Sequence, residues 1–323
     1  MAEPLESDSS LLVVVLDANV GAWARSPLAL DKALQQVVIF LNAYLALNTE
    51  NRLVVLGATA RECRFLHPSS SRAPEAADIQ VYEQFRAADV RVLAGVAALV
   101  DGAGPDQAQA QAQAQAPSLI SRALSMALCH ISRVNALLTN KAWARVLVVS
   151  AGADSAREYI SLMNSIFAAQ KASVLIDVCK VLGADSVFLQ QAADITGGNY
   201  VRVDVDAGES LLQTLMFTCL PDHYTRGILN APYNQLIDFR ATCFCHKRVV
   251  DIGYVCSVCL SIFCRTAPVC STCHTKFSFR IVGPGARDGS SPNGTQNTNN
   301  PQNGSQSSTT GTPSAAMSSL NLG

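Results

Sequence analysis

Residues 11–17 read Leu-Leu-Val-Val-Val-Leu-Asp, an unbroken aliphatic run that ends at a carboxylate. Three more short aliphatic runs follow at residues 53–56, 146–149 and 174–176. Runs without polar alternation are typical of strands buried on both faces, as in a parallel sheet. The first run therefore predicts a strand buried on both faces. Asp17 stands at its carboxyl end, where ligands bind in open α/β sheets.

The segments between these runs predict helices, because their apolar residues recur at spacings of three and four. These helical faces lie in residues 30–45, 120–138, 160–167 and 188–195. Alternating strands and helices predict an α/β, doubly wound, mostly parallel sheet of about six strands. Residues 63–67 follow the second run too closely for a helical crossover, so they predict an antiparallel edge strand. Residues 200–205 alternate apolar and polar side chains, as a half-exposed strand at the side of a sheet does, so they predict a second edge strand.

Composition divides the chain further. We expect a flexible N-terminus, the sheet domain, a connector, a cysteine-rich module and a disordered polar tail, at residues 1–10, 11–219, 220–238, 239–282 and 283–323. Residues 107–116 alternate Gln and Ala and are interpreted as a low-complexity loop insert. The tail consists almost wholly of small and polar residues, which bury too little apolar surface to fold.

Charge and hydropathy exclude several classes of protein. Lys and Arg number 24 against 25 Asp and Glu, so the chain is no polycation that binds nucleic acid or anionic membranes through net charge. Hydrophobic residues make up 49%, which favours extensive burial, against protein partners as well as internally. The acidic N-terminus does not resemble a signal peptide, and no apolar run approaches the roughly 18 residues of a membrane span. We expect a soluble intracellular protein without membrane contact.

Seven of the eleven cysteines fall within 31 residues near the C-terminus. Cys256-x2-Cys259 and Cys270-x2-Cys273 form two knuckles separated by ten residues, a spacing typical of one tetrahedral zinc held by four thiolates. A module this short has little core of its own, so we expect the metal to supply folding free energy. The sequence predicts a structural zinc site at these four cysteines.

A second zinc site is possible within the same module. Its ligands would be Cys243, Cys245, His246 and Cys264, and the two sites would interleave as in a RING-type cross-brace. Ala267 stands where a ligand paired with Cys264 would be expected in a RING domain. The other cysteines are expected to be small buried apolar residues: Cys63, Cys129, Cys179 and Cys219.

The cysteine-rich module has six basic residues and one acidic residue, a modest positive charge that bound thiolates reduce. Its aromatic residues could stack on bases, but a small core and a protein-docking face are favoured. These aromatic residues are Tyr254, Phe263, Phe277 and Phe279. Direct contact with nucleic acid is therefore expected to be weak or absent.

The edge of the sheet at Asp17 suggests a degenerate cation site. In an Asp-x-Ser-x-Ser pattern three oxygens can bind Mg²⁺, as in the metal-ion-dependent adhesion site of von Willebrand A domains, which the order of elements resembles. Here Asn19 and Gly21 stand where the two hydroxyls belong. Thr59 and Asp154 follow two other strands, where supporting oxygens are expected. Two interpretations of Asp17 remain open: it belongs to a weak Mg²⁺ site, or it only orders the loop that follows it.

Catalytic motifs are missing from the sequence: it contains no Gly-x-Gly-x-x-Gly loop, no P-loop and no Gly-x-Ser-x-Gly elbow. The five histidines show no helical spacing for a catalytic metal. We therefore expect a protein that is not an enzyme.

A von Willebrand A-like domain followed by Cys243-Phe-Cys-His246 and Gly253-Tyr-Val-Cys-Ser-Val-Cys-Leu-Ser-Ile-Phe-Cys264 resembles the core subunits of about 34 kDa of the transcription and DNA repair factor TFIIH. The resemblance covers residues 11 to about 282. It implies a non-catalytic nuclear subunit that acts in RNA polymerase II transcription initiation and nucleotide excision repair through protein–protein interactions.

The same resemblance implies partners and ligands. The partners are other TFIIH core subunits, especially the one that carries a von Willebrand A domain and a RING-like zinc module. The zinc ligands carried over are Cys256, Cys259, Cys270 and Cys273. Two rival hypotheses stay open: a RING-like ubiquitin ligase, and an Mg²⁺-dependent ligand-binding von Willebrand A protein.

Overall fold

The computed structural model forms two compact units, Met1–Phe239 and Arg240–Gly323, which are described separately. The residues that the structure describes are 9–24, 28–67, 81–101, 118–138, 142–155, 158–181, 183, 185–203, 210–229, 237, 239–246, 248–259, 261–277 and 317–321. The Gln-Ala segment at residues 107–116 lies outside them.

The first unit is built on a six-stranded sheet in the order β3-β2-β1-β4-β5-β6. All neighbouring strands run parallel except β3, which is antiparallel to β2. The strands are β1 (Ser10–Asp17), β2 (Arg52–Ala58), β3 (Cys63–His67), β4 (Trp143–Ser150), β5 (Leu175–Val181) and β6 (Tyr200–Val203). The predicted doubly wound, von Willebrand A-like fold class is confirmed, and both predicted edge strands lie at the edges.

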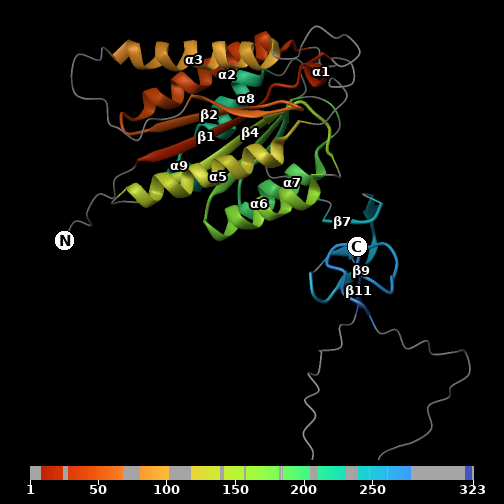
Figure 1. The fold of residues 1–323 in the computed structure, drawn as a ribbon. Helices are drawn as coiled ribbons and strands as arrows, with labels where there is room; N and C mark the ends of the chain where they lie inside the picture. Colours follow the sequence, from red (N-terminus) through yellow and green to blue (C-terminus); the bar gives the residue numbers. More distant parts are fainter. Residues whose placement is uncertain are drawn as a thin grey trace, which may run out of the picture. The chain divides into compact units, whose positions relative to one another are not determined.

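Helices cover both faces of this sheet (Figure 1). One face carries α2 (Leu30–Leu47), α3 (Val81–Asp101), α8 (Leu211–Thr214) and the π-helical turn η2 (Leu215–Cys219). The other carries α5 (Ile120–Leu137), α6 (Tyr159–Lys171) and α7 (Val187–Thr196). Two short helices, α1 (Val20–Trp23) and α9 (His223–Ile228), complete the unit, and α9 falls within the segment predicted as a connector.

The central strand β1 explains the uninterrupted aliphatic run. Leu12, Val14 and Leu16 belong to the hydrophobic core beneath α2 and α3. The alternate residues, Leu11 and Val13 among them, point to the opposite face and are equally buried. Because both faces are covered, no position along the strand favours a polar side chain.

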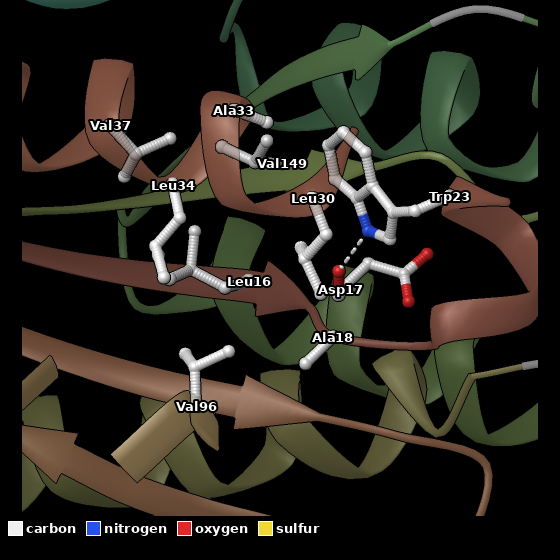
Figure 2. Close-up of a pocket in the computed structure, with 10 residues that line it drawn as sticks. All are labelled: Leu16, Asp17, Ala18, Trp23, Leu30, Ala33, Leu34, Val37, Val96 and Val149. Carbon is white, nitrogen blue, oxygen red and sulfur yellow. Dashed lines mark hydrogen bonds between the residues drawn. The ribbon is translucent and has the colours of Figure 1, made fainter. Parts of the chain in front are cut away.

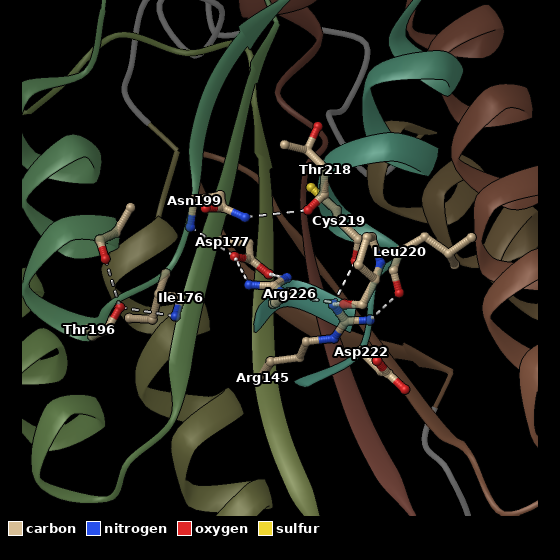
Figure 3. Close-up of polar contacts among 12 residues, drawn as sticks. Arg145, Ile176, Asp177, Thr196, Asn199, Thr218, Cys219, Leu220, Asp222 and Arg226 are labelled. Atoms are coloured by element: carbon tan, nitrogen blue, oxygen red, sulfur yellow. Dashed lines mark hydrogen bonds and ion pairs between the residues drawn. The ribbon is translucent and has the colours of Figure 1, made fainter. Parts of the chain in front are cut away.

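A buried ion pair ties the end of this unit to its sheet (Figure 3). Asp177 of β5 is 1% exposed, and its carboxylate accepts hydrogen bonds from both terminal nitrogens of Arg226 on α9. Asp177 Oδ1 also accepts from the backbone N–H of Asn199, at 2.9 Å. The two oxygens are thus fully engaged with a charged partner and a backbone donor, as a buried carboxylate requires.

Arg145 of β4 makes a second buried attachment to the same segment. Its Nη1 donates to the carbonyls of Cys219 at 2.6 Å and Pro221 at 2.9 Å, and its Nη2 donates to the carbonyl of Leu220 at 3.1 Å. These carbonyls lie at the end of η2, where a cation complements the negative end of a helix. Arg145 therefore caps η2 from within the sheet.

The turn from α7 into β6 passes so close to β5 that it requires glycine. Gly197 ends the helix with φ 75°, and a Cβ built on Gly198 would lie 2.1 Å from the Ile176 carbonyl oxygen. Since this neighbour is backbone of a central strand, the sheet itself would have to shift. We expect Gly198→Ala to lower the free energy of unfolding by about 3 kcal/mol, the upper end for overpacking.

Urea unfolding of the full chain measures this effect, and Gly227→Ala is the matched control. Gly227 lies on α9 and an added Cβ there meets no atom within 4 Å, so the control should be neutral or gain up to about 1 kcal/mol of helix propensity. Equal unfolding midpoints for the two variants would contradict the close approach at Gly198.

In the described residues of the second unit the strands are short: β7 (Ala241–Thr242), β8 (Val249–Val250), β9 (Ile252–Cys256), β10 (Ile262–Phe263) and β11 (Met317–Asn321). They form a two-stranded sheet, β7-β8, and a three-stranded sheet, β10-β9-β11. Strand β11 lies in the tail that was expected to be disordered, and it pairs antiparallel with β9 from Met317↔Cys256 to Asn321↔Ile252. That expectation therefore does not hold for these five residues.

Candidate functional site

The carboxylate of Asp17, at the end of β1, is buried and surrounded by hydrogen-bond donors. Its Oδ1 accepts from the backbone N–H of Asn19 at 3.1 Å and from the Ser118 hydroxyl. Its Oδ2 accepts from the backbone N–H groups of Ala151 at 3.3 Å and Gly152 at 2.9 Å. A carboxylate has about four lone-pair positions, so these four donors leave little capacity for a metal.

The other oxygens proposed for an Mg²⁺ site are engaged elsewhere. The Asn19 side chain caps α1 by accepting the N–H of Gly21, and the Thr59 hydroxyl bonds within its own turn. Asp154 accepts from the N–H of Phe188 at the start of α7. Among the residues that the structure describes, the clusters of three or more His, Cys, Asp or Glu side chains that could hold a metal lie in the second unit and do not include Asp17.

Ser118 and Ser150 are contacts of Asp17 that the sequence reasoning missed. The Ser150 hydroxyl is 3.4 Å from Asp17 Oδ2 and ends β4, the strand next to β1. A signal for Ser150 was present, because it directly follows the aliphatic run at residues 146–149, as Asp17 follows its own run. Ser118 follows the Gln-Ala segment, and no pattern links it to the sheet edge.

The pocket beside Asp17 is lined almost entirely by hydrocarbon (Figure 2). The Trp23 indole N–H donates to the backbone carbonyl of Asp17 at 2.6 Å, while the Asp17 carboxylate points away from the aliphatic side chains. These side chains include Leu16, Leu30 and Leu34. Such a lining stabilises the loop after β1 and offers no oxygen ligands to a cation.

The second unit brings the cysteines into two groups. Cys256, Cys259, Cys270 and Cys273 form one, and Cys243, Cys245, His246 and Cys264 form the other. Within each group every ligand atom lies within 4.8 Å of the others, so each group could hold a metal ion. The groups interleave along the chain, because Cys264 of the second group lies between the two knuckles of the first.

The four-cysteine group has dimensions suited to a tetrahedral ion. Sγ atoms are 3.7 Å apart for Cys256 and Cys273, and 3.6 Å apart for Cys259 and Cys270. Zn–S bonds of about 2.3 Å predict S–S separations of about 3.8 Å in a tetrahedron. Cys256 and Cys270 are buried and pack with Phe263 and Phe277, so cysteines form much of this core cluster.

The mixed group is more compact and more exposed. His246 Nδ1 lies 3.0 Å from Cys245 Sγ and 3.2 Å from Cys264 Sγ. The Cys243 and Cys245 sulfurs are 2.7 Å apart, so a tetrahedral ion would have to separate them by about 1 Å. The donor set of three thiols and one imidazole is one that zinc accepts in structural sites.

Local hydrogen bonds lower the pKa of thiols in both groups. Those from the side chain and backbone of Thr275 lower the pKa of Cys273 to about 6. Burial opposes ionisation of Cys243, but bonds from Cys245 and His246 lower its pKa to about 6. Because the thiolate is the form that binds metal, each group presents a ready first ligand near neutral pH.

The four scattered cysteines behave in different ways. Cys179 and Cys219 are fully buried, as predicted. The prediction was wrong for Cys129, which is exposed on α5, and Cys63 on the edge strand β3 is only partly buried. The sequence does not show that Cys129 is exposed, because a cysteine can lie on either face of an amphipathic helix.

Comparison with known proteins gives consistent matches. The family model for transcription factor Tfb4 matches residues 9–274. Subunit tfb4 of the general transcription and DNA repair factor IIH from Schizosaccharomyces pombe is 42% identical over 286 residues, which cover 86% of this chain and 92% of the relative. General transcription factor IIH subunit 3 from Dictyostelium discoideum is 39% identical over 264 residues, covering 78% and 69% respectively.

A solved structure agrees with these relatives. The crystal structure of the TFIIH p34 N-terminal domain superimposes with a TM-score of 0.56 at 32% identity, and the match covers 65% of this chain and 97% of that domain. The family match extends beyond that domain through both cysteine groups. The chain therefore belongs to the Tfb4 family of transcription factors.

Proposed function

We propose that this chain is a structural subunit of the nuclear transcription and DNA repair factor TFIIH, acting in RNA polymerase II transcription initiation and nucleotide excision repair through protein–protein contacts. One observation carries the proposal: the alignment with the Schizosaccharomyces pombe subunit covers 92% of that relative and 86% of this chain, so it must extend from the first unit into the second. The partners are other TFIIH core subunits, above all the one with a von Willebrand A domain and a RING-like zinc module.

The proposed role is non-catalytic. Open α/β sheets bind ligands at the carboxyl ends of their strands. At this edge the buried carboxylate, Asp17, is engaged by donors from three loops, and the adjoining pocket is apolar. These contacts support a loop-ordering role for Asp17 and a sheet domain that serves as a docking element.

The proposed cofactor is zinc, and its role is structural. Cys256, Cys259, Cys270 and Cys273 would hold the main ion, and the mixed group of Cys243, Cys245, His246 and Cys264 would hold a second. Bound there, zinc would cross-link segments that are distant in sequence. We propose residues 11–219 as the sheet domain, 220–238 as the connector and 239–282 as the zinc module, whose face docks protein and makes little or no direct contact with nucleic acid.

Native mass spectrometry of the full chain, alone and with the RING-bearing TFIIH subunit, tests both proposals. We expect two zinc ions in the free chain, one in Cys264→Ser, and a stable one-to-one complex that hydrolyses no nucleotide. Failure to bind any TFIIH subunit would overturn the proposed function. Ubiquitin discharge from conjugating enzymes would instead favour the ligase hypothesis.

A further inference from the structure

A lysine lies buried at the edge of the sheet where Asp17 is found. Lys180 is the penultimate residue of β5 and is 1% exposed. Its ammonium donates a hydrogen bond to the carbonyl of Gly152, whose own N–H donates to Asp17 Oδ2 at 2.9 Å. A single residue of the loop after β4 is thus held between a buried cation and a buried anion.

The carboxylates around Lys180 come from separate loops. Asp17 ends β1, Asp154 follows β4 and Asp185 follows β5, and all three attract the ammonium. Burial lowers the pKa of Lys180, and these three charges oppose that shift. Burying an ammonium is costly unless an opposite charge compensates it, and the same is true of the Asp17 carboxylate.

The three carboxylates differ in the other partners that they have besides Lys180. Asp154 binds the start of α7 through Phe188, and Asp185 accepts from the Tyr200 hydroxyl at 3.1 Å and faces Arg202 at 3.5 Å on the surface. Asp17 receives hydrogen bonds but no ion pair with an arginine or lysine among the described residues. Lys180 is the cation that acts on it from within the protein.

We infer that the Lys180 ammonium is the resident cation of this sheet edge: it balances the charge of Asp17 and fixes the loops after β1 and β4 without a divalent metal. This inference goes beyond the proposed function, since it concerns how a docking domain keeps its loops in place. A fixed positive charge also repels Mg²⁺ from the same oxygens. The edge is therefore permanently formed, whatever the cation concentration.

Thermal unfolding of the full chain tests the inference through a double-mutant cycle. Lys180→Met removes the charge and keeps the stem, and Asp17→Asn removes the opposite charge. Each should lower Tm by about 6 °C or more for a domain of this size. The double variant should lose clearly less than the sum, because neither charge is left unpaired. Lys171→Met, at an exposed position that ends α6, is the control and should not change Tm.

Strictly additive losses would overturn the inference, since Lys180 would then be packing without neutralising Asp17. A second measurement starts from the wild-type chain. Millimolar Mg²⁺ should leave the wild-type Tm unchanged and give no binding heat in calorimetry. If Mg²⁺ binds the wild type and Asp17→Ala abolishes that binding, a divalent ion and not Lys180 is the resident cation.

Discussion

Removal of metal from the full chain should unfold residues 241–277 and leave the sheet domain folded. One buried core cluster of the second unit consists of Phe263 and Phe277 with Cys256 and Cys270 of the four-cysteine group. Without a metal ion, nothing would link the Cys256–Cys259 knuckle to the Cys270–Cys273 knuckle through their sulfur atoms. Structural zinc contributes about 10–16 kcal/mol in zinc-finger peptides, far more than two phenylalanines supply.

Amide hydrogen exchange before and after chelation measures this effect for each segment. Cys256→Ser should reproduce the loss of protection in the second unit, whereas Cys129→Ser should behave like the wild type, because Cys129 is exposed on α5 and belongs to neither group. Protection that survives chelation in residues 252–256 would show that the strands are stable without metal.

The second large effect is expected from Asp177→Ala. This substitution leaves the Arg226 guanidinium, with a side chain only 15% exposed, without its anion, and it leaves the Asn199 N–H without its acceptor. Arg145 lies close enough to add repulsion. Breaking one partner of a buried pair costs about 3–5 kcal/mol, so we expect a loss of that size in chemical denaturation.

A paired replacement separates charge from packing. Asp177→Leu combined with Arg226→Met removes both charges, and buried pairs replaced in this way often recover stability. The double variant should therefore be more stable than Asp177→Ala, and Glu62→Ala, at an exposed pair with Arg64, should cost less than about 1 kcal/mol. A double variant no better than the single one would mean that the ion pair is not what makes Asp177 important.

The sequence predicted the sheet because its strands are aliphatic and its helices are periodic. It failed where charged residues are buried inside strands. The aliphatic run at residues 174–176 ends before Asp177, yet β5 continues to Val181 and includes both Asp177 and Lys180. Their partners, Arg226 and Gly152, come from distant segments, so no local pattern reveals that the two charges are compensated.

The cysteine spacing predicted which ligands would meet in the first group, because a Cys-x2-Cys knuckle is a local turn. The mixed group was left open, since Cys264 contributes alone and only the tertiary fold brings it to His246. Helix α3 was missed because its apolar positions include Ala and Gly, which weaken the periodic signal. Strand β11 was missed for another reason: its pairing with β9 is between backbones and has no side-chain signature.

The interleaved order of the two cysteine groups constrains when the second unit can form during synthesis. Cys243 and Cys245 leave the ribosome before Cys264, and Cys259 before Cys270. Neither group can therefore be completed from one local hairpin. The mixed group starts first, but Cys256 and Cys259 of the other group are made before its last member, Cys264. The sheet domain, which precedes both, can fold as an independent unit in the meantime. The mixed group can therefore close once Cys264 has been made, whereas the four-cysteine group can close only after Cys273.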